Sequence, residues 1–522
     1  MLRGFINCHI WHSDAEAILV SDDRIEKTGT NQEIKDALGS QDELIDVKGM
    51  YIVPGFIDSH MHLLELGYYL SHAQLSLCKS LDDIHAKLTA NLSQLKEGEW
   101  LTGRGWNEEN LKDHKFPDKK FLDTVSTTVP IAITRNDGHV MYVNSRALEK
   151  AGIQEDMEMD DGFIDFDTGR VEENAIQTIL KAEPEPDVQK LMDYVLTGMK
   201  YANANGITAV GSDDFLSLGT DYDKPLDALE KLSYQDRLTI RIQEQCEFKD
   251  IQSYAKFLDD GYTFDVGNDH FRIGPLKLIL DGSLGSHTAY MSKPYEDDRS
   301  TQGSMLLEDD EIEAYIKLAQ HFNMPVIAHA IGDGALDHIL DLYEKNLYEG
   351  NPLHSGIVHC QLMRKDQIDK VIKMKLSCYF QSVFIDEDAP IVEKRAGKDL
   401  ALTSYPYKTL YEATLSSNGS DAPVEMPSAL KGIELAVTRH SVSHPDYSLN
   451  PDECLSIDEA IASYTEKGAE QLFMQDRIGS IKKGYYADFV LLDQDITKCD
   501  VNKIHETKVM MTVMNGRTVY ER

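Results

Sequence analysis

The stretch YIVPGFIDSHMH (residues 51–62) decides the architecture of the chain. An apolar run enters Pro54 and Gly55 and then ends on two histidines, His60 and His62. Side chains two residues apart on an extended strand point to the same side, so both imidazoles face one space, with Asp58 on that side as well. The pattern predicts a buried strand that delivers two imidazoles to a common site at its end.

Seven further short apolar runs follow in the middle of the chain, with helix-like segments between them. They lie at 206–214, 238–246, 273–283, 324–334, 355–361, 375–382 and 415–423. Helical periodicity is clear at 309–322 and 364–375. Eight buried strands alternating with helices predict an α/β fold, a (β/α)8 TIM barrel. The alternative, an open doubly wound sheet, would carry a GxGxxG turn after an early strand, and none is present.

The two ends of the chain differ from the middle. Residues 1–53 and 478–522 consist of short β-prone runs separated by turn residues, which predicts one small β-sandwich domain built from both termini. The barrel is then expected over 54–77 and 200–477. Residues 78–199 form an insertion after the first barrel strand, expected as a subdomain over the active-site face. It would serve as a lid or substrate wall, or alternatively as an oligomerisation surface.

Composition narrows the class of partner and the location. The 522 residues carry a formal net charge of −37, which repels phosphate backbones and anionic lipid, so neither nucleic acid nor membrane is expected as a partner. Seven scattered cysteines without a CxxC pair fit reduced thiols. No apolar run approaches the roughly 20 residues that span a bilayer, and the N-terminus lacks a signal-peptide core. A cytoplasmic protein is expected.

Polar side chains recur where the predicted barrel strands end. They are His60, His62, Lys277, His329, His359 and Asp421. The strands of a barrel end on one face, so these side chains are expected to lie close together. Imidazole nitrogen and carboxylate oxygen are good zinc ligands. A lone histidine at a strand end is usually a hydrogen-bonded core residue, but four of them on three strands favour a divalent metal site.

Two members of this set have alternative roles. Lys277 as an ammonium has no lone pair and cannot be a ligand, unless the neutral amine takes up carbon dioxide as a carbamate. Its ordinary role would be an ion pair with a carboxylate, and Asp281 is near in sequence. Asp421 could cap the next helix, with Pro423 in the first turn, which is compatible with ligation.

The chain resembles the metal-dependent amidohydrolase superfamily, within it amidohydrolase family 3, the branch that includes N-substituted formamide deformylases. The resemblance covers nearly the full length. It rests on PGFIDSHMH, GRGW, RNDGHVMYVN, KLILDGSLGSHTA, AHAIGDGA, VHCQL, SDAPVE, AVTR and ADFVLLD. Two positions depart from the family pattern: His287 stands where relatives often carry Arg, and Ser382 where Pro is common. Both bear on substrate choice more than on metal chemistry.

The resemblance implies a role for each predicted ligand. His60 and His62 would bind the more buried metal, His329 and His359 the second, and carboxylated Lys277 would bridge both. Asp421 would ligate the buried metal. A metal-bound water has its pKa brought from about 15.7 to near 7, which supplies hydroxide to attack an amide-type C–N carbonyl. Asp421, as the catalytic residue, would take the proton and pass it to the departing nitrogen.

Two residues of the insertion are candidates for contact with a small-molecule amide-type substrate. His139 follows Gly138 in RNDGHVMYVN, where a sharp turn could aim its side chain at the substrate, and a structural hydrogen bond is the alternative. Trp106 between glycines could form an aromatic wall, and packing under the insertion is the simpler alternative.

A homodimer is expected by base rate alone.

Three classes of function fit these residues. The first is a binuclear metal hydrolase of a non-peptide C–N bond. The second is a mononuclear deaminase of the same fold, which would want a carboxylate beside His329, whereas Asp333 lies four residues on. The third is a non-catalytic relative with an assembly or regulatory role, which would have lost ligands. The metal content of the purified protein separates them: two ions, one or none.

Overall fold

The computed structural model describes residues 1–112, 114–136, 139–155, 157, 162–172 and 175–522. The chain divides into two compact units. One contains Met1–Leu66 and Leu191–Arg522, and the other, Gly67–Lys190, contains most of the insertion expected at 78–199 and is called the insertion unit. No helix among the described residues is long and apolar enough to cross a membrane.

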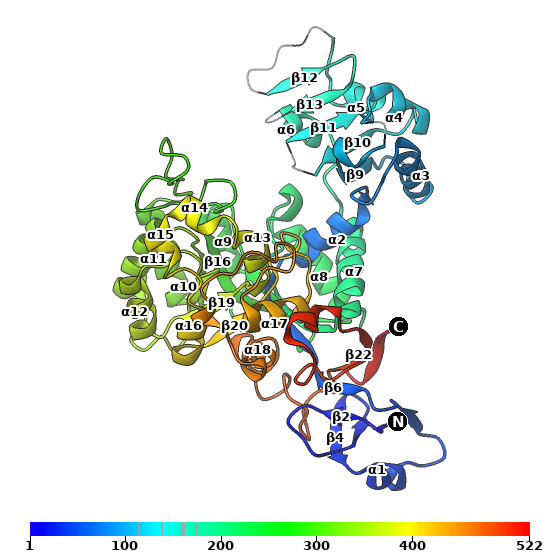
Figure 1. Ribbon diagram of the computed structural model, residues 1–522, viewed down its shortest axis with the longest axis vertical. Coiled ribbons are helices and arrows are strands. Elements are labelled where there is room, and N and C mark those ends of the chain that lie inside the picture. The colour runs from blue at the N-terminus through cyan, green and yellow to red at the C-terminus, as the bar shows by residue number, and fades with distance from the viewer. Residues whose placement is uncertain (113, 137–138, 156, 158–161, 173–174) are drawn as a thin grey trace. The chain divides into compact units, whose positions relative to one another are not determined.

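The larger unit is built on a sheet of eight parallel strands (Figure 1). In chain order these are β7 (Phe56–Met61), β14 (Ile207–Ser212), β15 (Arg241–Cys246), β16 (Phe271–Ile279), β17 (Val326–His329), β18 (Gly356–Val358), β19 (Ser377–Phe380) and β20 (Ser416–Asn418). Each strand pairs with the barrel strand that follows it along the chain. Between the first and last strands, the Ser59 hydroxyl donates to the Asn418 carbonyl at 3.0 Å, and the Asp421 N–H donates to the His60 carbonyl at 2.8 Å. The predicted (β/α)8 barrel is confirmed.

Helices alternate with these strands. They are α2 (Leu63–Ser71), α7 (Val188–Ala204), α8 (Asp223–Tyr234), α9 (Ile251–Asp259), α10 (Asp309–His321), α11 (Asp333–Asn346), α12 (Lys365–Met374), α13 (Ile385–Asp388), α14 (Val392–Ala396), α15 (Lys398–Ala401), α16 (Tyr407–Ala413), α17 (Ala429–Thr438), α18 (Ile457–Ser463) and α19 (Glu466–Gln471). The helices predicted at 309–322 and 364–375 correspond to α10 and α12.

The opening stretch, 51–62, is two strands rather than one. β6 (Tyr51–Pro54) pairs antiparallel with β21 (Phe489–Leu492) in a separate five-stranded sheet, and β7 then begins the barrel. Gly55 stands between them, where an added Cβ would lie 2.1 Å from the Thr208 hydroxyl. The expectation of one continuous strand is wrong because the chain changes sheets at this glycine.

Strands from both chain ends form two sheets that share a core. The four-stranded sheet contains β4 (Arg24–Gly29), β3 (Ala17–Ser21), β1 (Leu2–Ile6) and β5 (Glu43–Asp46), and the five-stranded one contains β2 (His9–Ile10), β6, β21, β22 (Val509–Met514) and β23 (Arg517–Glu521). The rings of Phe5 and Phe489 meet edge to face, 5.0 Å between centroids, in a core that also buries Ile18 and Val513. The short helix α1 (Asn31–Ala37) packs beside the first sheet.

A buried ion pair joins this β-rich part to the base of the barrel. Arg241, at the start of β15, donates from Nε and Nη2 to the two carboxylate oxygens of Asp488, at 2.7 and 3.1 Å. The Asn515 N–H adds a third hydrogen bond to the same carboxylate. Both charged side chains are only 2% exposed. The ion pair between Arg241 and Asp488 therefore holds the terminal strands against the barrel.

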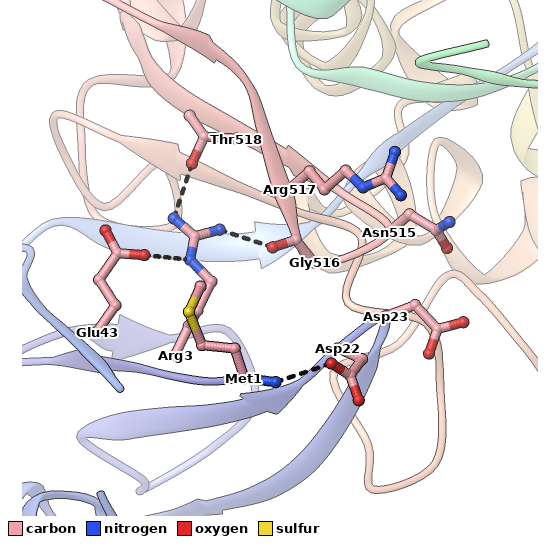
Figure 2. Close-up of a pocket in the computed structure, with 9 residues that line it drawn as sticks. All are labelled: Met1, Arg3, Asp22, Asp23, Glu43, Asn515, Gly516, Arg517 and Thr518. Carbon is pink, nitrogen blue, oxygen red and sulfur yellow. Dashed lines mark hydrogen bonds and ion pairs between the residues drawn. The ribbon is translucent and has the colours of Figure 1, made fainter. Parts of the chain in front are cut away.

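A charged cleft of about 450 Å³ lies in the β-rich part (Figure 2). Arg3 crosses it, donating to Glu43, to the Gly516 carbonyl and to the Thr518 hydroxyl, while the N-terminal amine pairs with Asp22. None of the residues predicted to bind metal or substrate lines this cleft. Its polar groups connect the two sheets.

The insertion unit has a mixed six-stranded sheet of its own. In sheet order the strands are β12 (Phe163–Asp165), β13 (Arg170–Glu172), β11 (Val140–Val143), β10 (Ile131–Arg135), β9 (Leu101–Trp106) and β8 (Ala73–Gln74). Its helices are α3 (Leu81–Leu92), α4 (Lys119–Val125), α5 (Ser145–Lys150) and α6 (Ala175–Leu180). Two apolar clusters, one including Ile131 and the other Ala132, form its core.

Candidate metal centre

The six predicted ligands come from the carboxyl-terminal ends of the barrel strands. His60 lies in β7 and His62 just beyond it, Lys277 in β16, His329 at the end of β17, and His359 and Asp421 just after β18 and β20. Four of the six are buried, and the side chains of His62 and His329 remain 20% and 15% exposed. The barrel thus gathers all six on the face where enzymes of this architecture keep their chemistry.

Three of these side chains form a tight cluster. Asp421 Oδ1 lies 3.3 Å from His60 Nε2 and 3.2 Å from His62 Nε2. One ligand atom from each of the three residues falls within 4.8 Å of the others, a spacing that could hold one metal ion. Asp421 has a left-handed backbone (φ 58°), which turns the chain immediately after β20.

Hydrogen bonds behind the two imidazoles decide what they present to this cluster. His60 Nδ1 lies 2.5 Å from Gln245 Oε1, and His62 Nδ1 lies 2.7 Å from the Asp213 carbonyl oxygen. Because these oxygens only accept, both Nδ1 atoms must donate, so Nε2 is the nitrogen that each ring turns toward Asp421. An Nε2 without a proton has a lone pair for a cation, and together with the Asp421 oxygen the two rings offer the donor set that a cation would need.

Protonation of the metal-free cluster follows from burial and charge. Burial, reinforced by the Lys277 ammonium, lowers the pKa of His60 to about 4. Burial also disfavours charge on His62, but the hydrogen bond to Asp421 and the charge of Asp213 outweigh it and raise that pKa to about 10. Burial opposes ionisation of Asp421, yet its bonds to His60 and His62 hold its pKa well below the usual range. A cation would replace the His62 proton.

The other two histidines form a second cluster beside the first. His359 Nε2 lies 2.8 Å from His329 Nδ1, and the rings of His60 and His359 are 5.7 Å apart between centroids. His329 Nε2 faces the Gly282 carbonyl at 3.1 Å, so its Nδ1 is the atom turned toward His359. His359 Nδ1 lies 2.8 Å from Gln381 Oε1. Burial and the neighbouring His329 keep the pKa of His359 well below its usual value.

Lys277 lies between the first cluster and a buried carboxylate. Its Nζ is 3.1 Å from Asp213 Oδ2 and 3.4 Å from His60 Nε2. The carboxylate partner considered from sequence, Asp281, is not used in this way. Asp281 instead accepts the backbone N–H groups of Tyr290, Ile331 and Gly332 at 2.8–3.0 Å. The carboxylate that pairs with Lys277 instead comes from just beyond β14, which is separated from β16 by β15.

Sequence reasoning missed three residues that support the site: Asp213, Gln245 and Gln381. All three are buried at or just beyond the ends of predicted strands, which is the one signal that could have found them. Asp58, expected to share the space of the histidines, instead accepts the Ser420 N–H at 2.9 Å and belongs to the barrel closure.

The two candidate substrate residues lie in the insertion unit. The Trp106 side chain is 1% exposed, donates to the Ile133 carbonyl at 3.4 Å and packs against Tyr142. The packing interpretation describes Trp106 as the structure places it, and a substrate contact by Trp106 stays a prediction. His139 is exposed, and residues 137 and 138 before it lie outside the described part of the chain. A substrate contact by His139 stays a prediction.

The family-divergent residue His287 is used within its own loop. Its Nε2 lies 3.0 Å from Asp297 Oδ1, and its ring meets Tyr295 edge to face. His287 therefore supports the loop that follows β16.

The chain is similar in sequence to known proteins over nearly its full length. The model of the amidohydrolase family matches residues 43–520. The chain is 33% identical to the amidohydrolase-like protein YtcJ of Bacillus subtilis (strain 168), covering 99% of this chain and 98% of that protein. It is 24% identical to N-substituted formamide deformylase of Arthrobacter pascens, over 98% of this chain and 96% of that protein.

A solved structure extends this likeness to three dimensions. An uncharacterised metal-dependent hydrolase from Pyrococcus horikoshii OT3 superposes with a TM-score of 0.79 at 29% identity, covering 96% of this chain and 99% of the other. Fold and sequence agree: the chain is a hydrolase of carbon–nitrogen bonds and belongs to the amidohydrolase family of metal-dependent hydrolases.

Proposed function

We propose that the chain hydrolyses an amide-type C–N bond of a small molecule at a divalent metal centre, zinc by the preference of its donors. The observation that carries this is the convergence of His60 Nε2, His62 Nε2 and Asp421 Oδ1 around one point, with no donor hydrogen on either nitrogen once a cation replaces the His62 proton.

The residues divide the work of holding metal. His60, His62 and Asp421 would hold one ion, and His329 through Nδ1 with His359 through Nε2 would hold a second. Lys277 would leave Asp213, lose a proton to become the neutral amine and add carbon dioxide with release of a second proton to solvent, and the resulting carbamate would link the two sites. When bound, the metal supplies a hydroxide at neutral pH and polarises the substrate carbonyl.

Asp421 carries the proton transfer. The bonds from His60 and His62 that hold its pKa well below the usual range belong to the metal-free cluster. Once both imidazoles turn to a metal these bonds are lost, and the ionised carboxylate would be a stronger base that could accept a proton from the attacking water. The departing nitrogen is a poor leaving group until it is protonated, and Asp421 returns the proton to it. The backbone places the carboxylate at this centre, since the Asp421 N–H donates to the His60 carbonyl at 2.8 Å.

The deaminase alternative would need a carboxylate other than Asp333 as its proton shuttle, and Asp281 Oδ1 lies 3.3 Å from His329 Nε2. Asp333, the carboxylate nearest to His329 along the chain, accepts the Ser292 N–H at 2.8 Å and pairs with Arg364 at 2.7 Å. That carboxylate is therefore committed to a structural ion pair and points its oxygens at other partners.

The test is a metal analysis together with a substrate panel. Purified protein should bind one or two divalent ions and hydrolyse at least one member of a panel of N-formyl, N-acyl and cyclic amides. Asp421→Asn should lower kcat by about 100–10,000-fold, the range for a positioned acid–base group. A protein that binds no divalent ion, or an Asp421→Asn variant with wild-type kcat, would contradict the proposal.

A further inference from the structure

Two buried glutamines stand directly behind the metal-site histidines. Gln245 accepts from His60 Nδ1 and Gln381 from His359 Nδ1, and both glutamines are fully buried. A histidine that binds metal through one nitrogen generally donates its other N–H to an acceptor, which fixes the ring and its tautomer. The same residue type thus stands behind one histidine of each cluster.

Gln245 is constrained at both ends of its amide. Its Nε2 donates to the Ser59 carbonyl at 2.9 Å while its Oε1 faces His60 Nδ1 at 2.5 Å. Turning the amide over would set NH₂ against the His60 N–H and oxygen against the Ser59 carbonyl, losing both bonds in a buried site. His60 is therefore held with its proton on Nδ1 and its lone pair on Nε2.

Gln381 is constrained at one end only. Its Oε1 meets His359 Nδ1 at 2.8 Å, but its Nε2 is buried with no hydrogen-bond partner among the described residues. Turning this amide over costs no bond at the far end. His359 Nε2 is meanwhile engaged with His329 Nδ1 at 2.8 Å.

We propose that Gln245 is a positioning residue that presets His60 for a cation, and that Gln381 does the same for His359 with a weaker hold. The inference rests on the proposed metal centre. The two metal sites should therefore differ in how well their histidines are oriented before an ion binds. The ion held by His60, His62 and Asp421 meets a prepared site, whereas the ligands His329 and His359 must first reorganise.

The experiment compares near-isosteric variants of the full chain. Gln245→Met removes the acceptor and keeps the volume, and Gln245→Glu keeps an acceptor for His60. Gln243→Met is the matched control, since Gln243 lies on the same strand, is 3% exposed and bonds the Leu472 carbonyl instead of a histidine. Zinc affinity of the metal-stripped proteins is measured by calorimetry, with the thermal midpoint as a check on folding.

Gln245→Met should bind the first zinc ion about 10–100-fold more weakly than wild type, the usual cost of losing such a partner. Gln245→Glu should bind it more tightly than Gln245→Met, and Gln243→Met should match wild type. Gln381→Met should weaken only the second ion, and by less.

Three results would overturn the inference: wild-type affinity in Gln245→Met, an equal loss in Gln243→Met, or a larger loss in Gln381→Met than in Gln245→Met. Wild-type protein that takes up no zinc would instead remove the metal centre itself, and this assignment with it.

Discussion

The buried aspartates at the base and at the mouth of the barrel have different kinds of partner. At the base, Asp488 accepts two hydrogen bonds from Arg241 and one from the Asn515 N–H. At the mouth, Asp421 faces the nitrogens of His60 and His62, which turn their lone pairs toward it once His62 is deprotonated. The first carboxylate faces a permanent guanidinium charge, whereas the second is balanced in the metal-free protein by the His62 proton. A cation can replace that proton, so an exchangeable partner charge marks the part of the barrel suited to binding.

Replacing a mouth ligand should have the largest effect on activity. His60→Asn should abolish binding of the first metal ion and reduce kcat/KM to background, because the carboxylate and one imidazole alone do not hold the ion. The thermal midpoint of the metal-free protein should change little. Metal content by mass spectrometry and kcat/KM report the two effects, and a variant that retains a full complement of metal would erase the distinction between mouth and base.

Replacing the base carboxylate should reverse that pattern. Asp488→Ala leaves the Arg241 guanidinium buried without its partner and should cost about 3–5 kcal/mol in the free energy of unfolding. Denaturant unfolding measures it, while kcat per folded molecule should stay at the wild-type value. Asp23→Ala, which removes an exposed partner of Arg24, is the control and should cost no more than about 1 kcal/mol.

Lys277 tests whether the mouth carries a bridging group. Lys277→Ala should lower kcat/KM by at least about 100-fold, because losing even an outer partner of a metal ligand costs about 10–100-fold and Lys277 is proposed as a ligand itself. Added acetate or propionate should restore part of the activity, since a small carboxylate can occupy the space of the carbamate. Failure of every short carboxylate, with a single ion bound per chain in wild type, would leave Lys277 as the ion-pair partner of Asp213.

Asp386 offers the smallest and most pH-sensitive difference. Burial disfavours its charge, but Lys431, the Ser443 N–H and the hydroxyls of Ser441 and Ser443 more than compensate and hold its pKa below the usual range. Asp386→Asn should cost about 1.5–3 kcal/mol at pH 7. This stabilisation is complete above the unfolded value of about 3.9, so the gap between the two proteins should begin to narrow below about pH 4 and close as pH falls through the lower folded pKa. Unfolding curves at pH 7, about pH 4 and about pH 2 show whether it does.

The sequence was informative where chemistry follows from strand direction. His60, His329 and His359 each follow an apolar run, and parallel strands of a barrel end together, so their convergence was predictable. The supporting residues were not. An amide such as Gln245 has no periodic signature, and its bond to His60 depends on the register between β7, β14 and β15. Trp106 shows the same limit from the other side, since its flanking glycines do not reveal whether the ring faces a core or a ligand.

The position of the first cluster on the barrel has a mechanical consequence. His62 and Asp421 are 359 residues apart along the chain, yet they meet where the first strand adjoins the eighth. An ion bound by both residues would link the first barrel strand to the eighth. Separating these two strands would break its coordination and release it. Loss of the cofactor and opening of the scaffold would then be a single event, and the enzyme's durability would rise and fall with the supply of metal around it.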